Sequence, residues 1–235
     1  MQRIRDVWVT TYWLEDFRNN YSYSCPNQNL SRMDYYWYMN NSWILYGYYI
    51  YTWNSNNYLL DVTKYTLSTI GPWVYLATGK VEYYYDSTNV LITKTELWSF
   101  YGCVWINDNN ELYYYENTGN KIETIRQIWN STGSNWVNDY RYLYQCNSNN
   151  VLLTILYQDW QLDSLNWKNV WRETYTYTPQ NKIATMFKEI WTQATGWNNY
   201  VLRTYFYDAN YNWTEKITYL WDGTDWKNYY RHVAT

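Results

Sequence analysis

The chain of 235 residues contains 18 Lys and Arg against 21 Asp and Glu, which gives a net charge of -3. Nucleic-acid binding depends on basic residues that neutralise phosphates, so this balance argues against a nucleic-acid partner. The sequence also has no apolar run of about 18 residues, and we therefore expect no transmembrane helix.

Tryptophan recurs along the whole chain at intervals of 29 to 32 residues, and a second Trp series precedes the first by five to seven residues. A period of this length is typical of repeat proteins, in which one supersecondary unit is stacked on the next. We therefore predict a single repeat domain over residues 1–235, built from eight units. The first series is Trp13, Trp43, Trp73, Trp105, Trp136, Trp167, Trp197 and Trp226. The second series is Trp8, Trp37, Trp98, Trp129, Trp160, Trp191 and Trp221.

A Tyr-x-Tyr pair follows the first-series Trp in seven of the eight units, at distances of 8, 6, 10, 8, 6, 8 and 8 residues. All these distances are even, and a strand places residues i, i+2 and i+4 on one face. The spacing predicts an extended strand with Trp and Tyr on one aromatic face. The pairs are Tyr21/Tyr23, Tyr49/Tyr51, Tyr83/Tyr85, Tyr113/Tyr115, Tyr142/Tyr144, Tyr175/Tyr177 and Tyr205/Tyr207.

A second strand is expected after each Tyr pair, where several units read Asn-x-(Ile/Leu)-x-Thr, as in Asn120, Ile122 and Thr124. Segments rich in Asn, Ser and Gly separate the strands, as hairpin turns require. We predict an all-β antiparallel meander of about 16 strands between Arg3 and Val233. Because strands twist by about 20 to 25° each, such a sheet should curl into a spiral or a barrel-like shell.

Catalytic groups are scarce in the sequence. His232 is the sole histidine, and neither a His/Cys metal spacing nor a Gly-rich phosphate loop occurs. The third unit departs from the pattern, but its segment Ala77-Thr78-Gly79-Lys80 contains no acid. We predict a protein that is not an enzyme and uses no cofactor or metal. A carbohydrate-active enzyme on a β scaffold, with a pair of carboxylates, is the alternative.

The three cysteines fall outside the positions taken as repeated, in or beside turns. Their number is odd, so no complete set of disulfides follows, and we expect free structural thiols. The residues are Cys25, Cys103 and Cys146.

The segments Tyr205-Phe206-Tyr207-Asp208 and Tyr113-Tyr114-Tyr115-Glu116-Asn117-Thr118-Gly119 resemble the Tyr-Asp (YD, or Rhs-type) repeats of secreted bacterial proteins. The period of about 30 residues with added Trp is similar to a longer variant found in bacterial surface proteins. The resemblance implies a spiral or shell of β-hairpins, an extracellular or cell-surface location, and no catalytic residues. An encapsulating shell segment of the Rhs type is a second alternative.

Together these features predict a noncatalytic extracellular repeat module with a structural or adhesive role. Trp and Tyr rings can stack on sugars, and Asn side chains offer paired donors and acceptors for hydroxyls, so glycans or other cell-surface material are the expected partners. The oligomeric state is left open. The candidate glycan-binding residues are Trp105, Trp136, Trp167, Trp197, Asn107, Asn138, Asn169, Asn199, Tyr113, Tyr144, Tyr175 and Tyr205.

Overall fold

The computed structural model describes residues 2–9, 12–23, 29–39, 42–67, 75–88, 90–100 and 104–234, with backbone alone for residues 2–18, 99 and 100. Trp73, Cys25 and Cys103 lie outside this range. The described residues form sixteen strands and no helix. The strands are Gln2–Val9 (β1), Tyr12–Tyr23 (β2), Leu30–Met39 (β3), Ser42–Trp53 (β4), Leu59–Leu67 (β5), Tyr75–Tyr85 (β6), Leu91–Phe100 (β7), Val104–Tyr115 (β8), Lys121–Asn130 (β9), Asn135–Cys146 (β10), Leu152–Gln161 (β11), Asn166–Tyr177 (β12), Ile183–Thr192 (β13), Gly196–Tyr207 (β14), Trp213–Trp221 (β15) and Trp226–Val233 (β16).

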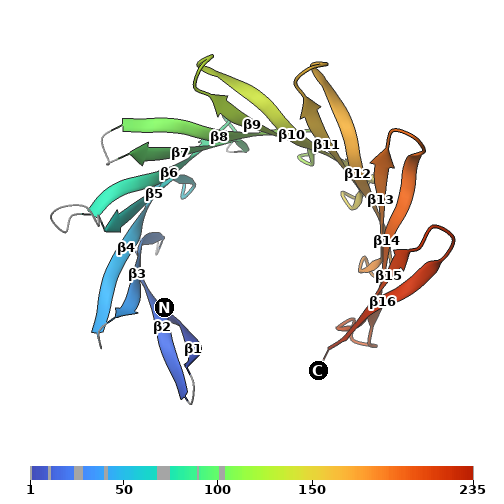
Figure 1. Ribbon diagram of the computed structural model, residues 1–235, viewed down its shortest axis with the longest axis horizontal. Helices are drawn as coiled ribbons and strands as arrows, with labels where there is room; N and C mark the ends of the chain where they lie inside the picture. The colour runs from blue at the N-terminus through green and yellow to red at the C-terminus, as the bar shows by residue number, and fades with distance from the viewer. Residues whose placement is uncertain are drawn as a thin grey trace. The chain divides into compact units, whose positions relative to one another are not determined.

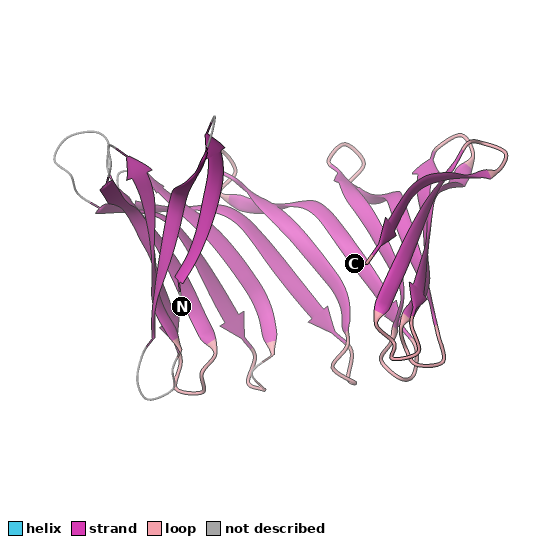
Figure 2. Ribbon diagram, turned by 90° about the horizontal axis from the view of Figure 1, so that it is seen from below, coloured by secondary structure: helices cyan, strands magenta, loops and turns pink. Residues whose placement is uncertain are grey.

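The strands follow one another in the sheet in the order of the chain, from β1 to β16 (Figure 1). The pairings between successive strands are antiparallel, as the register of β11 with β12 illustrates. Hairpin turns join the strands at both of their ends (Figure 2). The predicted all-β meander of hairpins is therefore confirmed.

The chain divides into two compact units. One contains Met1–Glu111 with Ile128–Trp136, and the other contains Leu112–Gln127 with Val137–Thr235. The division passes through β8, β9 and β10 rather than through a linker. In both units the same hairpin is repeated, so the local geometry of one repeat describes the others.

Each repeat whose register is described has two β-bulges, one in the strand before the turn that follows the Tyr pair and one in the strand after it. In β12, Tyr157 pairs with Trp171 and Gln158 pairs with Asn169, which leaves Val170 as an extra residue. In β13, Tyr177 pairs with Ile183 and Thr176 pairs with Thr185, which leaves one extra residue there as well. A bulge bends its strand and increases the local twist. The extra residues of the even-numbered strands are Asp16, Tyr46, Thr78, Val170, Tyr200 and Tyr229.

The bulge is a reference point from which positions in different repeats can be compared. It shows that the wrong residue of the third unit was assigned to the first Trp series. Tyr75, paired with Leu67, stands three residues before its bulge, where Trp167 stands in β12. Tyr75, and not Trp73, therefore occupies the position of the recurring Trp. Likewise Trp43 pairs with Tyr38, so that Trp37 lies one residue out of the second series.

The Tyr pairs of two units are also shifted relative to the sequence assignment. Cys146 pairs with Leu152 as Tyr177 pairs with Ile183, and Trp53 pairs with Leu59 in the same way. The true pairs are therefore Tyr51/Trp53 and Tyr144/Cys146, each two residues later than expected. With these corrections the distance from the recurring aromatic residue to the first Tyr is eight residues in all seven repeats.

Cys146 consequently occupies a repeated position, contrary to the expectation from sequence. It sits where the other units carry Tyr or Trp at the end of the strand. Its thiol is free and half-buried in the described part of the chain.

Neighbouring hairpins are joined only near the middle of each strand. β12 pairs with β11 over Asn166–Thr174 and with β13 over Trp171–Tyr177, so only Trp171–Thr174 have a partner on both sides. Outside this central band the hairpins separate, and their tips stand apart in Figure 1. Apolar burial is correspondingly slight, because Met186 and Val201 are the only hydrophobic residues that are buried in the described part.

Candidate functional site

The bulges decide which aromatic residues share a face. Trp167 pairs with Trp160, and Trp171 pairs with Tyr157, so three steps along β11 correspond to four steps along β12. Side chains alternate along a strand, and one extra residue reverses the alternation. Trp167 therefore lies on one face of the sheet, termed here the Trp face, and Tyr175 lies on the opposite face, termed the Tyr face.

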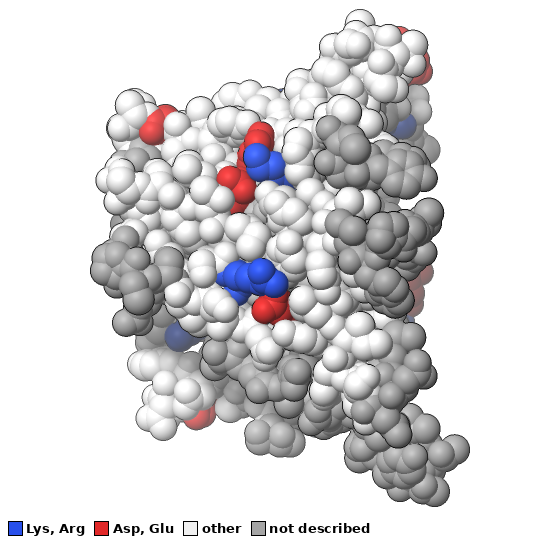
Figure 3. Space-filling view, turned by 90° about the vertical axis from the view of Figure 1, so that its left-hand side faces the viewer, with Lys and Arg blue, Asp and Glu red and all other residues white. Residues whose placement is uncertain are grey.

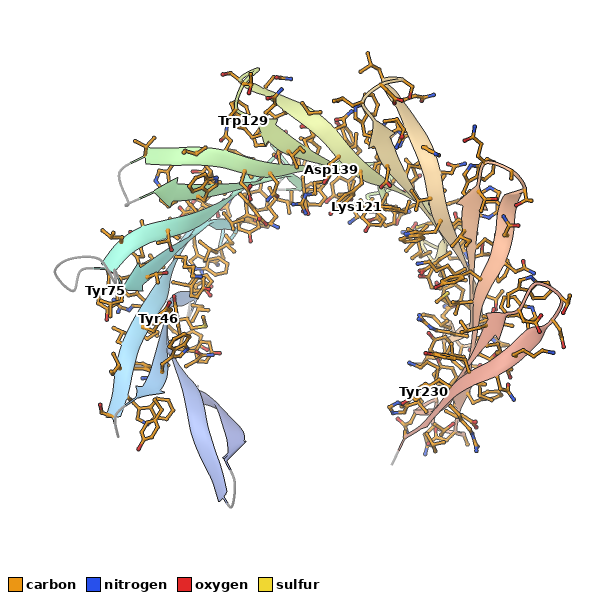
Figure 4. All side chains as sticks on the ribbon, in the orientation of Figure 1. Tyr46, Tyr75, Lys121, Trp129, Asp139 and Tyr230 are labelled. Carbon is orange, nitrogen blue, oxygen red and sulfur yellow. The ribbon has the colours of Figure 1, made fainter. Side chains whose placement is uncertain are left out.

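The predicted single aromatic face is thus wrong for the repeats whose register is described. In β14 the extra residue Tyr200 separates Trp197 from Tyr205 in the same way. Asn169 and Asn199 stand two residues after their Trp and before the bulge, so they stay on the Trp face. The candidate residues of these two repeats are therefore divided between two faces instead of forming one surface. Side chains extend from both faces of the ribbon in Figure 4, where Lys121 and Trp129 mark the two ends of β9.

On the Trp face, the recurring indoles pack edge to face across each hairpin. The ring centroids of Trp160 and Trp167 are 4.9 Å apart at an interplanar angle of 67°. Trp191 and Trp197 show almost the same geometry, with 5.1 Å and 73°. Edge-to-face aromatic pairs contribute about 0.5–1.5 kcal/mol beyond their buried area. The recurring Trp is therefore explained by a contact inside its own hairpin.

An arginine from the preceding hairpin covers the second Trp of each of these pairs. The guanidinium carbon of Arg141 lies 4.7 Å from the ring centroid of Trp167, and that of Arg172 lies 4.6 Å from Trp197. Arg141 also donates to Gln158 at 2.6 Å and to Glu123 at 2.9 Å. Gln158 in turn donates to Asn169 at 2.6 Å. The side chains therefore link four strands, β9 to β12, and the predicted Asn169 is part of this network.

Charged side chains are few on the sheet and occur mostly as pairs, as the face of the molecule in Figure 3 illustrates. Lys80 and Glu82 are 2.7 Å apart, and Arg32 and Asp34 are 2.6 Å apart. Tyr84 donates to Glu82 at 2.6 Å, and this hydrogen bond, with burial, raises the pKa of Tyr84 to about 12. The phenol therefore stays protonated and acts as a donor even above pH 10, where an ordinary phenol ionises.

The Tyr face carries the densest cluster of aromatic and charged groups, at Tyr157, Trp171, Lys188, Glu173 and Tyr175. The rings of Tyr157 and Trp171 stack at 5.3 Å and 14°. The ammonium of Lys188 lies 3.7 Å from the centroid of Trp171 and 3.3 Å from a carboxylate oxygen of Glu173. Tyr175 donates to the other oxygen of Glu173 at 2.6 Å. The Lys188 ammonium is therefore paired with both Glu173 and the Trp171 ring, and the Glu173 carboxylate accepts from both Lys188 and Tyr175.

The sequence reasoning included Tyr175 but missed the rest of this cluster. Trp171 belongs to neither Trp series, and Lys188 lies in the middle of the following strand. The position directly after the bulge carries Trp171, Val201 and Tyr230 in three repeats but Gly47 and Gly79 in two others, so residue type gave no signal for this cluster.

Alkaline pH should destabilise the fold partly through Tyr175. Burial, and next the hydrogen bond to Glu173, raise the pKa of its phenol above the ordinary value of 10.0. A raised folded pKa gives stabilisation that is complete below pH 10.0 and is lost as the pH rises toward the folded value. We expect the free energy of unfolding of Tyr175→Phe to be lower by about 1 kcal/mol at neutral pH and to fall less steeply above pH 10.

Tyr205→Phe is the matched control, because Tyr205 holds the same repeat position and makes no recorded hydrogen bond through its hydroxyl. Denaturant unfolding at a series of alkaline pH values would measure both variants. An alkaline slope equal to that of the unmodified chain in Tyr175→Phe would contradict the role of the phenol.

In four repeats the second residue of the pair reaches the preceding strand beyond the end of their ladder. It thereby joins two of the hairpins that are closed by the turns after the Tyr pairs, such as β10–β11 and β12–β13. The Tyr177 hydroxyl donates to the Leu152 carbonyl at 2.6 Å, and the Tyr207 hydroxyl donates to the Ile183 carbonyl at 3.0 Å. Tyr85 reaches the Leu59 carbonyl at 2.9 Å. In β4 the indole N–H of Trp53 replaces the phenol and reaches the Leu30 carbonyl at 2.8 Å. We call these contacts the hairpin clasps.

Removing one clasp should lower stability modestly, because the hydroxyl satisfies a carbonyl at the point where the ladder ends. We expect Tyr177→Phe to lower the free energy of unfolding by about 1 kcal/mol. Cys146→Tyr should raise it, since that repeat has no clasping hydroxyl at the equivalent position. Urea unfolding would measure both changes, and a Tyr177→Phe chain as stable as the original would contradict the clasp.

The ring of the sole histidine in the sequence contacts only aromatic residues in the described part of the chain. His232 lies in β16 with its ring centroid 5.0 Å from that of Trp213, and its Nδ1 is 3.4 Å from the Tyr230 hydroxyl. No carboxylate is recorded in contact with it. Within the described ranges, no group of three or more His, Cys, Asp or Glu side chains is arranged to hold a metal ion. The described residues form no helix that could span a membrane.

The described fold is that of an all-β repeat protein made of successive hairpins. No family model matches the chain, and no curated protein matches it. A protein of unknown function from Bacteroides fragilis is 14% identical over 57% of this chain and 94% of its own, with a TM-score of 0.46. A DUF3836 family protein from Bacteroides vulgatus is 21% identical over 38% of this chain and 90% of its own, with a TM-score of 0.34.

A third solved structure, of TcdB2-TccC3-Cdc42, is similar over nearly the whole chain. Its identity is 11% over 97% of this chain, with a TM-score of 0.46, and this chain covers 13% of that one. These likenesses are too distant to assign a family, so the resemblance to Tyr-Asp repeats stays a prediction.

Proposed function

We propose that the chain is a noncatalytic structural module, a β-sheet wall whose hairpins fix one another without a ligand. The hairpin clasps carry this proposal, because a donor at the same repeat position bonds to an equivalent carbonyl in repeats of both units. The edge-to-face indoles join the two strands of a hairpin such as β11–β12, and the covering arginines link that hairpin to the preceding one. Most of the described aromatic side chains thus serve contacts between strands.

A structural role predicts stability that is distributed over the repeats. In repeat proteins, stability is approximately a sum of unit terms and contacts between neighbours. Removing the clasps at Tyr85, Tyr177 and Tyr207 together should therefore lower the free energy of unfolding by about the sum of the single losses, near 3 kcal/mol. The unmodified chain should unfold cooperatively in buffer with no ligand added.

The same preparation would be tested against polysaccharides, glycosides, esters and peptides, with no turnover expected. Turnover that a single Asp or Glu substitution abolishes would contradict the proposal in favour of the carbohydrate-active enzyme. Clasp removal that leaves stability unchanged would contradict the structural role itself.

Adhesion to glycans through the Trp and Tyr ladders is the second candidate, and an extracellular or cell-surface location belongs with it. It is favoured by the indoles of Trp136, Trp167 and Trp197, which remain half-exposed despite their contacts. Binding of immobilised glycans that weakens in Trp167→Ala, with Trp160→Ala as the control from the same aromatic pair, would support it. The encapsulating shell segment implied by the Tyr-Asp resemblance stays a further alternative.

A further inference from the structure

The turns that follow the Tyr pairs share one geometry. At one position the other described turns carry Asn or Gly, whereas the last turn carries Tyr211. In turn 208–212, the amide of Tyr211 donates to the Asp208 carbonyl at 3.0 Å, and Tyr211 has a φ of 61°. The equivalent residues of the other described turns also have positive φ. They are Asn57, Gly119, Asn150 and Asn181.

Asn and Gly tolerate this backbone region, whereas a large aromatic residue does not. Holding Tyr211 there costs about 1 kcal/mol, and such strain is typical of functional positions. The turn itself is well held without the ring. The Asp208 carboxylate accepts the amides of Asn210 and Asn212, each at 2.8 Å. The hydrogen bonds from the Asn212 backbone and side chain help to hold the pKa of Asp208 below its usual range.

Tyr211 lines an open notch of 280 Å³ between its own turn and turn 178–182. Phe206 also lines the notch, and the two aromatic residues are 42% (Phe206) and 48% (Tyr211) exposed. The residues equivalent to these two in the preceding repeat are Thr176 and Asn181. Two exposed rings therefore meet polar groups in this notch, whereas the neighbouring repeat supplies no ring at either position.

Two polar groups on the notch wall are not used by the protein. They are the Lys182 ammonium and the Gln180 side-chain amide, for which no hydrogen bond or ion pair is recorded within the described residues. Together they offer donors and an acceptor around the rings. Small-molecule sites combine apolar and aromatic lining with a few polar groups that fix orientation, and 280 Å³ is close to the lower end of their size range.

We propose that this notch binds a pyranose unit of a glycan, with the Phe206 and Tyr211 rings against the sugar and Lys182 and Gln180 on its hydroxyls. The assignment is independent of the structural role of the sheet. It differs from the Trp and Tyr ladders in using one site, and of the sequence-predicted residues only Tyr205 lines it. The strained backbone at Tyr211 then serves binding and adds nothing to the stability of the turn.

The test is a substitution expected to act in opposite directions on stability and on binding. Tyr211→Asn restores the residue of the neighbouring turns and should raise the free energy of unfolding by about 1 kcal/mol. Binding of soluble cello-, chito-, manno- and galacturonan oligosaccharides to the whole chain would be measured by calorimetry. We expect at least one of them to bind at one site with a Kd of about 1 mM or tighter, and Tyr211→Asn to weaken it at least tenfold.

Phe206→Thr, which copies Thr176, should weaken the same sugar. Asn150→Gly is the matched control, since it alters a positive-φ residue in a turn outside the notch and should leave binding unchanged. Absence of binding to all four oligosaccharides, or equal binding by Tyr211→Asn, would overturn the site. Neither result would alter the clasp measurements, so the two proposals fail separately.

Discussion

Gly47→Ala is expected to destabilise the fold strongly, by about 3 kcal/mol in the free energy of unfolding. A Cβ at Gly47 would lie 2.3 Å from the Tyr35 hydroxyl and 2.3 Å from the Tyr65 carbonyl oxygen. The carbonyl belongs to the backbone of β5 and cannot move aside without breaking the ladder. The Tyr35 ring is held by Tyr46 and Tyr49, with centroids 5.7 and 5.6 Å away.

Gly79→Ala is the matched control, because Gly79 also stands directly after the bulge of its strand. Its nearest neighbours would be the Lys64 Cβ at 3.9 Å and the Leu97 carbonyl at 4.0 Å, and it lines an open pocket of 190 Å³. Alanine should fit there and stabilise the strand by up to about 1 kcal/mol. Urea unfolding would compare the two variants, and equal losses would contradict the packing of Tyr35 over Gly47.

These two glycines mark a limit of sequence reasoning about the fold. Both follow the recurring aromatic residue by four positions, so the sequence presents them as equivalent. The number of hairpins and the strand order could be predicted, because each follows from periodicity and from short turns. Which glycine is covered depends on Tyr35, a residue outside the repeated pattern.

The face of each ring could not be obtained from residue spacing for a related reason. A bulge that recurs in each described repeat adds one residue everywhere, so the Trp-to-Tyr distance stays at eight and looks like an unbroken strand. In the third unit, residue type points to Trp73 as the recurring aromatic residue. The distance of eight residues to Tyr83 points to Tyr75 instead. Spacing was the stronger signal, because the pairing of strands constrains position more than it constrains ring type.

The candidate site was less predictable than the fold. Trp167 and Tyr175 were selected as parts of one surface, and the extra residue Val170 places them on opposite faces. The notch at Tyr211 was not selected, although an aromatic residue in a turn position held elsewhere by Asn or Gly was visible in the sequence. Its meaning depends on the positive φ, which only the structure supplies.

Arg172→Met is expected to cause the second large effect, a loss of about 2–3 kcal/mol in the free energy of unfolding at neutral pH. Glu189 is only 8% exposed and accepts two hydrogen bonds from the Arg172 guanidinium, one of them at 2.9 Å. Removing the cation leaves a carboxylate in a nearly buried position and uncovers the Trp197 ring. Because the Arg172 side chain is itself 41% exposed, the loss should fall below that of a fully buried pair.

The preceding repeat provides the control for this prediction, because it places the neutral Gln158 beside Arg141 at the position that Glu189 holds beside Arg172. In a double-mutant cycle, Arg172→Met in a Glu189→Gln background should cost about 1 kcal/mol, since no charge is left without a partner. The excess in the single variant then measures the penalty of the isolated carboxylate. Equal losses in the two backgrounds would show that Arg172 acts only by covering Trp197, because a guanidinium over an indole is indifferent to the charge of residue 189.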